Sequence, residues 1–319
     1  MPNVLVLGGT GFVGRSLCEK LVSRNGGAGA RIIVPSRRPA RGGRRIWMLP
    51  TVELFKADIH DDRELTRLVA HCDTVINLVG ILHGSEAACD RVHVQLPRRL
   101  AQSGLGANVN RVVHGGALGA AADAPSRYLR SKAAGEAALV SKALDLTVLR
   151  PSVMFGDGDR FLTLFARLQA VFPVIPLAAA QARFQPVWVD DVASAIVRCL
   201  DDRTTIGQTI ECCGPEVRTL EQLVRLAGRC AGHPRPIIEL PAALGRLQAA
   251  VLERLPGAPL LSRDNLDSMR VASVASGELP GLARLGIQPA AVEGVAQVYL
   301  GNAQGPGRLE AWRAAAHRH

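Results

Sequence analysis

A short apolar run ends in a cluster of glycines near the start of the chain: Val4-Leu-Val-Leu-Gly-Gly-Thr-Gly-Phe-Val-Gly14. The run has the pattern of a buried strand, and the residues from Phe12 to Arg24 have helical periodicity. Glycines allow a tight turn, close approach of a ligand to the backbone, and close packing of the helix on the strand. The arrangement predicts a site that binds phosphate at the helix N-terminus. Its candidate residues are Gly8, Thr10, Gly11, Phe12, Val13 and Gly14.

Strand and helix patterns alternate from this loop to Arg150. We expect strands at 4–8, 30–35, 52–57, 74–79, 111–114 and 146–149, and helices at 12–24, 61–70, 91–103 and 128–143. This alternation predicts an α/β fold with a Rossmann-type, doubly wound parallel sheet. Beyond Arg150-Pro151, frequent prolines break the chain into short pieces. We therefore expect a dinucleotide-binding domain over 1–150, a smaller and mostly helical region over 151–304 with some segments returning to the first domain, and a tail over 305–319.

The positive charge of the chain is concentrated near the second expected strand. The 319 residues include 38 Lys and Arg and 28 Asp and Glu, a net charge of +10. The stretch from Lys20 to Val52 alone has eight basic residues and no acidic one. A protein that binds nucleic acid would be expected to spread such charge over a binding face. We therefore expect a local anionic ligand and no nucleic acid.

The end of the second strand indicates which ligand this is. In a NAD-binding unit an acidic residue about 20 positions after the glycines holds the ribose 2′-hydroxyl. Here that place reads Pro35-Ser-Arg-Arg38. A carboxylate would repel a 2′-phosphate, whereas arginine binds one through charge-assisted, bidentate hydrogen bonds. The sequence predicts NADP(H) in preference to NAD(H), with Ser36, Arg37 and Arg38 on the 2′-phosphate.

Other features exclude several classes of protein. Seven cysteines with no Cys-x-x-Cys spacing predict neither a metal site nor a disulfide framework. No uncharged apolar run reaches 18 residues, which predicts no transmembrane segment, and the early strand leaves no room for a signal peptide. In the segment 242–255, Leu244, Leu247, Val251, Leu252 and Leu255 form one helical stripe. We expect this stripe to face the core, with a membrane or partner surface as the alternative.

Several further motifs carry a resemblance to a known superfamily. They are Asp58-Ile59, Asn77-Leu-Val-Gly80 and Tyr128-Leu-Arg-Ser-Lys132. With the glycine loop, they resemble the short-chain dehydrogenase/reductase superfamily in its extended or atypical branch. The motifs Arg127–Glu136, Arg150–Gly156, Phe184–Val187 and Gly214–Glu216 resemble one subfamily more closely. That subfamily is the nucleotide-binding accessory subunit of respiratory complex I and its bacterial relatives, some of them connected with ubiquinone metabolism.

The resemblance implies a set of cofactor contacts along the strand ends. Asp58 and Ile59 would lie against the adenine. The nicotinamide side would be lined by Leu78, Val79 and Gly80. The remaining implied contacts are Lys132, Pro151 and Val153.

Tyr128 and Lys132 are the catalytic residues that the resemblance implies. Tyr128 would be the acid, and Lys132 would hold the nicotinamide ribose. The spacing supports this pair independently, because residues i and i+4 share a helix face. An ammonium near a phenol also favours the phenolate, so we expect Lys132 to lower the pKa of Tyr128.

One member of the superfamily's catalytic set is missing. Its reductases place Ser or Thr just beyond the fifth strand, where the hydroxyl polarises the substrate carbonyl. Here the stretch reads His114-Gly-Gly-Ala-Leu-Gly119, and Gly115 or Gly116 takes the place of the hydroxyl. Losing one such donor typically costs about 10²–10³ in turnover. His114 is a conceivable substitute, and a structural histidine is the alternative.

Two functions therefore remain open. The first is an NADP(H)-binding protein with weak or no turnover, a structural or redox-sensing element linked to respiratory complex I or ubiquinone metabolism. The second is an active NADPH-dependent reductase or epimerase that acts on a small carbonyl or nucleotide-sugar substrate through Tyr128 and Lys132. The first implies a peripheral contact with a respiratory or quinone-biosynthesis membrane complex. We expect a cytoplasmic protein, with such a contact at the inner membrane.

Overall fold

The computed structural model describes residues 3–27, 31–42, 46–106, 111–140, 144–257 and 259–301, and no side chains at 41–42 and 104–106. The chain forms two compact units. The first unit comprises Met1–Pro151, Val189–Cys212 and Ala275–Gln288, and the second comprises Ser152–Trp188, Cys213–Val274 and Pro289–His319. The expected tail over 305–319 lies outside the described residues. Among the described residues, no helix has the length and apolarity needed to cross a bilayer.

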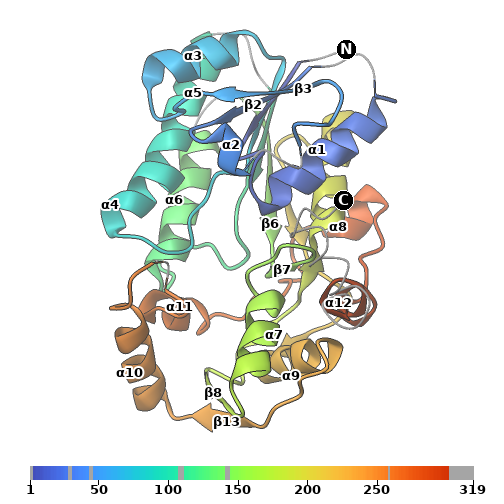
Figure 1. Cartoon of the computed structure of the whole chain (residues 1–319). Coiled ribbons are helices and arrows are strands. Elements are labelled where there is room, and N and C mark those ends of the chain that lie inside the picture. Colours follow the sequence, from blue (N-terminus) through green and yellow to red (C-terminus); the bar gives the residue numbers. More distant parts are fainter. Residues whose placement is uncertain are drawn as a thin grey trace. The chain divides into compact units, whose positions relative to one another are not determined.

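The first unit is built on a seven-stranded parallel sheet with the order β11-β6-β5-β4-β1-β2-β3 (Figure 1). The strands are β1 (Val4–Leu7), β2 (Ile32–Ser36), β3 (Val52–Lys56), β4 (Thr74–Asn77), β5 (Arg111–Gly115), β6 (Asp145–Pro151) and β11 (Thr209–Cys212). The order reverses direction at β1, so the chain winds outward both ways from the centre. This is the predicted doubly wound α/β fold.

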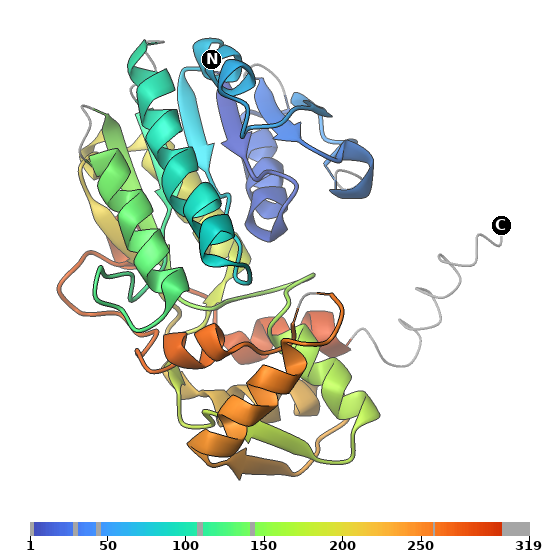
Figure 2. The same ribbon diagram turned by 90° about the vertical axis from the view of Figure 1, so that its left-hand side faces the viewer.

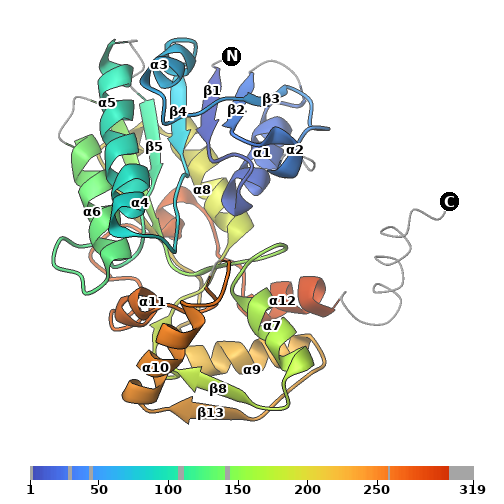
Figure 3. The ribbon, with the colours of Figure 1, turned by 60° about the vertical axis from the view of Figure 1, so that its left-hand side comes forward.

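Helices cover both faces of this sheet. One face carries α1 (Phe12–Arg24) and α8 (Val189–Asp201), which pack on each other. The other face carries α3 (Asp62–Ala70), α5 (Leu96–Gly106) and α6 (Arg127–Val140), with α5 beside α6 (Figure 2). Before α5 come α4 (Glu86–Cys89) and a π-helical segment, η1 (Asp90–Gln95). The short helix α2 (Pro39–Gly42) lies next to β3 at one edge of the sheet (Figure 3).

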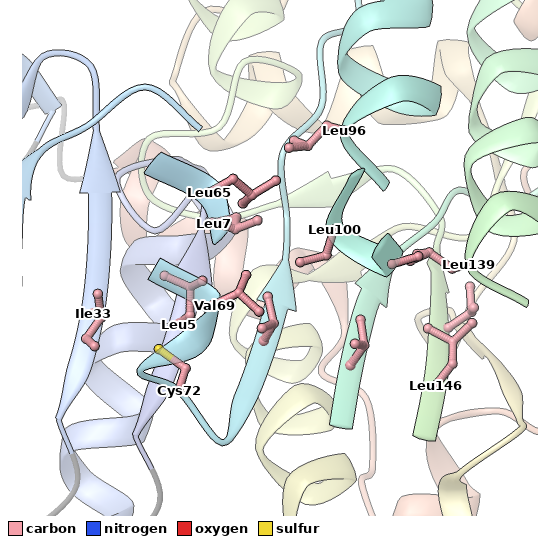
Figure 4. Packing of buried hydrophobic residues seen from close by; sticks show 14 residues of the cluster. Leu5, Leu7, Ile33, Leu65, Val69, Cys72, Leu96, Leu100, Leu139 and Leu146 are labelled. Carbon is pink, nitrogen blue, oxygen red and sulfur yellow. The ribbon is translucent and has the colours of Figure 1, made fainter. Parts of the chain in front are cut away.

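The core of the first unit lies between the sheet and the layer of α3, α5 and α6. Leu5 and Leu7 of β1 belong to one buried cluster with side chains from these helices, among them Leu65, Leu100 and Leu139 (Figure 4). All five of these leucines are fully or almost fully buried. Burying one such side chain contributes about 1.5–3 kcal/mol to the free energy of unfolding. The apolar strands and the apolar faces of the helices can be buried together only when they pack as layers, which explains this arrangement.

The second unit is mostly helical, as the sequence predicts. Its helices are α7 (Leu162–Val171), α9 (Leu220–Cys230), α10 (Ala242–Leu252), α11 (Arg263–Ser268) and α12 (Val292–Gly301). Three small strand pairs join them: β7 (Met154–Phe155) with β10 (Val187–Trp188), β8 (Ile175–Ala178) with β13 (Ile237–Leu240), and β9 (Arg183–Phe184) with β12 (Arg218–Thr219). The buried Asp159 carboxylate accepts hydrogen bonds from three backbone N–H groups and, at 2.6 Å, from the Tyr299 hydroxyl. These bonds fix the entry into α7 against α12.

The stripe on α10 does not face the core, which corrects the expectation from periodicity. Leu244, Leu247 and Val251 are exposed, as is Leu255 just beyond the helix, and Leu252 is half-buried. Among the described residues of α10 it is the small ones, Gly245 and Ala249, that are buried. A Cβ on Gly245 would lie 2.8 Å from the Cβ of Ala178, so this helix packs through its smallest side chains on β8.

Candidate functional site

The glycine loop between β1 and α1 is shaped by close contacts that only glycine permits. Gly8 has a φ of 84°, in the left-handed region. A Cβ on Gly14 would lie 2.4 Å from the carbonyl oxygen of Gly8 and 2.5 Å from the Cα of Gly9. Such distances are far inside van der Waals contact, so Gly14 sets how closely α1 approaches the strand.

The N-terminus of α1 is left open toward the loop. Gly11 stands at the cap position and provides no side-chain cap, and the first turn of the helix has no acidic residue. The first N–H groups of a helix have no partner within the helix, and they carry the positive end of its dipole. This end of α1 therefore suits an anionic ligand, and phosphate above all.

The basic residues of the site follow the end of β2. The Ser36 carbonyl accepts a hydrogen bond from Ala57 N–H at 3.1 Å, and its hydroxyl accepts one from Arg38 N–H at 3.3 Å. The side chains of Arg37 and Arg38 are exposed. Because β2 pairs in parallel with β1, these residues end at the same edge of the sheet as the glycine loop. Arg44 and Arg45 lie outside the described residues.

Asp58 and Ile59 form the turn that follows β3. The Asp58 carboxylate accepts a hydrogen bond from His60 N–H at 3.0 Å, and its own N–H donates to the Glu64 carboxylate. Ile59 is half-buried and packs against the core of the first unit. The two residues are thus held on the same sheet edge by local bonds and by packing.

The residues after β4 lie against the glycine loop. A Cβ on Gly8 would be 3.1 Å from the carbonyl carbon of Leu78, and Leu78 N–H donates to the Leu7 carbonyl at 2.9 Å. The amide oxygen of the buried Asn77 accepts from Val79 N–H at 3.2 Å. The structure therefore brings together two of the segments that the sequence singled out, the loop and Leu78–Gly80.

Lys132 is buried on α6, and its ammonium donates to the backbone carbonyl of Gly115. Burial lowers the pKa of Lys132 to about 8, although the nearby Glu136 carboxylate acts in the opposite direction. The ammonium is therefore tied to the end of β5, the strand next to β4.

Tyr128 stands one helical turn before Lys132. The sequence predicts that Lys132 lowers the pKa of Tyr128, but in the structure this pKa is raised. Burial, with smaller effects of Cys89 and Glu136, raises the pKa of Tyr128 to about 12. In the chain alone, the desolvation of the phenol outweighs any attraction between its ionised form and the ammonium.

His93 in η1 is a site residue that sequence reasoning missed. Its ring packs edge-on against the ring of Tyr128, with centroids 5.6 Å apart and planes at 81°. Its Nε2 accepts a hydrogen bond from Ile81 N–H at 3.0 Å, and its Nδ1 lies 2.7 Å from the Ser131 hydroxyl oxygen. Since Nε2 accepts, Nδ1 carries the proton. Burial and the Lys132 charge lower the pKa of His93 to about 4, which keeps the ring neutral.

His114, the conceivable substitute for the missing hydroxyl, is buried at the end of β5 and faces Asn77 across the strand pair. The Asn77 oxygen is used by Val79, so its amide nitrogen donates to Nδ1 of His114 at 3.2 Å. The proton of His114 therefore sits on Nε2, which has no hydrogen-bond partner among the described residues. Burial lowers the pKa of His114 well below its ordinary value. The ring is a neutral donor held inside the protein.

Gly115 and Gly116 differ in the room that they leave for a side chain. A Cβ on Gly115 would meet the nearest atom, the Asn77 carbonyl oxygen, at 3.4 Å. A Cβ on Gly116 would lie 2.3 Å from Oε1 of Glu136, a buried carboxylate that Arg150 holds at 2.6 and 3.0 Å. A hydroxyl side chain at 116 thus requires the Glu136–Arg150 ion pair to shift, whereas position 115 has space for one.

The last two expected contacts fall in different units. Pro151 ends β6 in the first unit, and its carbonyl accepts from Leu118 N–H at 3.1 Å. Val153 belongs to the second unit, where its carbonyl accepts from Val187 N–H at 3.0 Å. Every expected site residue except Val153 therefore belongs to the first unit.

Comparisons with known proteins identify relatives of this chain. The model of the NAD-dependent epimerase/dehydratase family matches residues 4–213. The mitochondrial NADH dehydrogenase (ubiquinone) 1 alpha subcomplex subunit 9 of Mus musculus is 30% identical, over 90% of this chain and 77% of the relative. The ceramide reductase of Caulobacter vibrioides is 28% identical, over 75% of this chain and 73% of the relative.

Solved structures share the fold. The epimerase Mth375 of Methanothermobacter thermautotrophicus superposes with a TM-score of 0.76 at 16% identity, covering 99% of this chain and 94% of that one. At this identity the likeness concerns the fold alone.

Proposed function

The chain belongs to the NAD-dependent epimerase/dehydratase family, and on that premise we propose that its first unit binds NADP(H) and that turnover is weak or absent. In this proposal the protein is a structural or redox-sensing element of a respiratory or quinone-linked membrane assembly. The relationship to a complex I subunit, at 30% identity over most of both chains, supports the assembly. The contact would be peripheral.

The main support for the binding of NADP(H) is the chemistry of the residues at two neighbouring strand ends, β1 and β2. The end of β1 leads to an uncapped helix N-terminus that suits the pyrophosphate. The end of β2 presents Ser36, Arg37 and Arg38 where a NAD-specific site would present a carboxylate. Guanidinium groups bind a 2′-phosphate through bidentate, charge-assisted hydrogen bonds. The residues present therefore fit a dinucleotide with a third phosphate.

Further residues would complete the binding of the cofactor. Leu78, Val79 and Gly80 would line the nicotinamide side, and Lys132 would bind the ribose hydroxyls. Asp58 and Ile59 would contact the adenine, and Pro151 would add a further contact with the cofactor. NADP(H), when bound, supplies a hydride donor or acceptor, and the chain's own contribution is to orient it and to exclude water.

Three features of the catalytic residues support weak turnover. Burial raises the pKa of Tyr128 to about 12, which makes it a poor proton donor near neutral pH. Lys132 donates a hydrogen bond to the backbone carbonyl of Gly115, which holds its ammonium at the end of β5. Neither Gly115 nor Gly116 offers a hydroxyl to a substrate carbonyl.

The alternative is an active NADPH-dependent reductase or epimerase on a small carbonyl or nucleotide-sugar substrate. It is favoured by the presence of Tyr128 and Lys132 on one face of α6 and by the similarity to a relative named ceramide reductase. In that case Tyr128 would hold the proton for the substrate oxygen. His114, whose Nε2–H is buried and without a partner among the described residues, would be the nearest replacement for the missing hydroxyl.

Two measurements test the proposal. Calorimetric titration of the purified chain with NADPH and NADH should show tighter binding of NADPH, and equal or tighter binding of NADH would refute the 2′-phosphate site. Oxidation of NADPH against a panel of quinones, ketones and aldehydes should be slow or absent. Turnover that Tyr128→Phe abolishes would establish the reductase instead.

A further inference from the structure

The π-helical segment η1 packs unusually close to the helix that carries Tyr128 and Lys132. On that helix, a Cβ at Gly135 would lie 1.9 Å from the carbonyl oxygen of His93. The backbone of η1 can therefore approach α6 at a distance that a side chain at position 135 would prevent. π-Helical turns are rare, and they occur frequently at functional sites. His93 lies in this turn and is buried against α6.

The His93 ring belongs to a chain of hydrogen bonds that runs in one direction. Ile81 N–H can only donate, so at 3.0 Å it makes Nε2 of His93 an acceptor and leaves the ring proton on Nδ1. Nδ1–H then donates to the Ser131 hydroxyl at 2.7 Å, and this hydroxyl donates to the Tyr128 carbonyl at 2.8 Å. Both ring nitrogens are therefore occupied within the protein.

The segment 78–81, which follows β4, is held at its two ends by different parts of the first unit. At its start, Leu78 N–H donates to the end of β1 at 2.9 Å. Its other end lies against His93, because a Cβ on Gly80 would be 3.6 Å from Nε2 and Ile81 donates to the same atom. The sheet therefore fixes the start of the segment, and His93 fixes its end.

The residues expected at the adenine end of the cofactor are held without His93. The Ser36 hydroxyl accepts from Arg38 N–H at 3.3 Å, and the Asp58 carboxylate accepts from His60 N–H at 3.0 Å. These bonds are local to the ends of β2 and β3 and include no residue of η1 or α6. A change at His93 should therefore act on one half of the nucleotide site.

We propose that His93 is a positioning residue for the nicotinamide half of that site. It ties residues 78–81 to α6 and packs edge-on against the Tyr128 ring, with centroids 5.6 Å apart. The segment expected to line the nicotinamide and the helix bearing Tyr128 thus keep one relative position. Without the ring, the end of the segment is released and has to be ordered again when nucleotide binds. The inference rests on the proposed dinucleotide site, but not on its preference for NADP(H).

The test compares two ligands that share the adenine end. NADPH carries the nicotinamide, and adenosine 2′,5′-bisphosphate carries the same 2′-phosphate without it. In calorimetric titrations of the full chain, His93→Leu should bind NADPH about tenfold more weakly than the wild type, because ordering one released backbone residue costs about that factor. Its affinity for the bisphosphate should stay within about twofold, because that end shares no partner with His93. Equal losses for both ligands, or no loss for NADPH, would overturn the proposal.

Two further variants separate positioning from stability. His93→Gln keeps an acceptor for Ile81 N–H and a donor for Ser131, and it should restore most of the affinity for NADPH. Val94→Ala shortens a buried side chain of the same segment that is not part of the hydrogen-bond chain, and it should weaken neither ligand selectively. A His93→Gln variant as weak as His93→Leu, or a selective loss of NADPH in Val94→Ala, would contradict the assignment.

The fluorescence of bound NADPH gives a second readout, since it reports the surroundings of the nicotinamide. At saturation, its enhancement over free NADPH should be smaller in His93→Leu than in the wild type and restored in His93→Gln. Urea unfolding verifies that each variant is folded. Ser131→Ala breaks the same chain at its α6 end and should show the same selectivity, so the test stands even when His93→Leu does not fold.

A failure of the proposed cofactor preference gives a different result from a failure of this inference. If the wild type binds NADH more tightly, the same comparison is made with NADH and ADP-ribose. The loss in His93→Leu should again be confined to the ligand that carries the nicotinamide. A wild type that binds no dinucleotide would refute the nucleotide site itself, and the role of His93 with it.

Discussion

The backbone N–H of Ile81 donates a hydrogen bond to Nε2 of His93 at 3.0 Å. The other ring nitrogen of His93 reaches Ser131, which lies between Tyr128 and Lys132 on α6. Ile81 directly follows Leu78–Gly80, the segment next to the glycine loop. One neutral imidazole thus connects the segment expected to line the nicotinamide with the helix that carries Tyr128 and Lys132.

This connection predicts a stability that depends on pH. The pKa of His93 is about 6.5 in an unfolded chain and about 4 in the folded one. Between these values the unfolded state takes up a proton that the folded state does not, so acidification destabilises the fold by up to about 3 kcal/mol. Urea unfolding at pH 7 and near pH 4.5 should show this loss for the wild type, and a clearly smaller one for His93→Gln.

The choice of glutamine matters for that comparison. Its side chain can accept from Ile81 and donate to Ser131, whereas His93→Leu leaves the Ile81 N–H buried without a partner, at a cost of about 1–3 kcal/mol. At pH 7 His93→Leu should therefore be less stable than His93→Gln. His114 is present in all three proteins and its pKa is lowered mainly by burial, so the difference reports chiefly on His93. Identical pH dependence in wild type and His93→Gln would contradict the assignment.

Ionisation of Tyr128 should occur only at high pH. The chain has two tyrosines, Tyr128 and Tyr299, and both have raised pKa values. In a Tyr299→Phe variant, phenolate absorbance after a rapid pH jump should begin above about pH 11, one unit below the pKa of Tyr128. A midpoint below 10, the ordinary pKa of the phenol, would show instead that Lys132 controls this group.

Gly14→Ala should destabilise the first unit and weaken nucleotide binding together. The added methyl would lie 2.4 Å from a backbone oxygen that cannot move alone, and overpacking of this kind costs about 1–3 kcal/mol. Gly294→Ala is the matched control, because a Cβ there meets nothing within 4 Å in an exposed part of α12. It should gain up to about 1 kcal/mol. Urea unfolding and nucleotide titration of both variants should show the loss of stability and of binding in Gly14→Ala but not in Gly294→Ala.

Replacing Arg37 and Arg38 by alanine should weaken the binding of NADPH much more than the binding of NADH. Each hydrogen bond between a guanidinium and a phosphate contributes about 1.5–3 kcal/mol, so affinity for NADPH should fall by at least about tenfold. Affinity for NADH should stay within about twofold. Arg225→Ala removes an exposed guanidinium, paired with Glu221, from the second unit and should change neither value. A parallel loss for both cofactors would place the two arginines outside the 2′-phosphate site.

Much of the first unit could be predicted from local patterns. Helix α1 begins and ends at the predicted residues, Phe12 and Arg24, because an apolar period of 3.6 starts directly after the glycines. The seventh strand, β11, was not predicted. Its four residues pair with β6 from a distant part of the chain, and so short an apolar run has no clear period of its own.

In the candidate site, too, features that depend on neighbouring residues in the sequence could be predicted, and features that depend on distant residues could not. The glycine loop and the arginines after β2 follow from residues that are adjacent in sequence. His93 did not stand out, because its role depends on Ile81 and on Ser131, 38 positions later. Periodicity identified the α10 stripe but could not tell which side faces solvent, since small residues such as Gly245 and Ala249 make the inner face. The pKa of Tyr128 depends on burial, which spacing does not reveal.

The interleaving of the two units constrains how this chain can be synthesised and divided. The sheet of the first unit is completed by β11 at residues 209–212, and that unit receives its last segment at 275–288. During translation, one edge of β6 therefore stays unpaired until residues 209–212 of β11 have left the ribosome. A fragment that stops at residue 150 would retain the glycine loop but lack α8 and β11, so the first unit should not be expressed alone as that fragment.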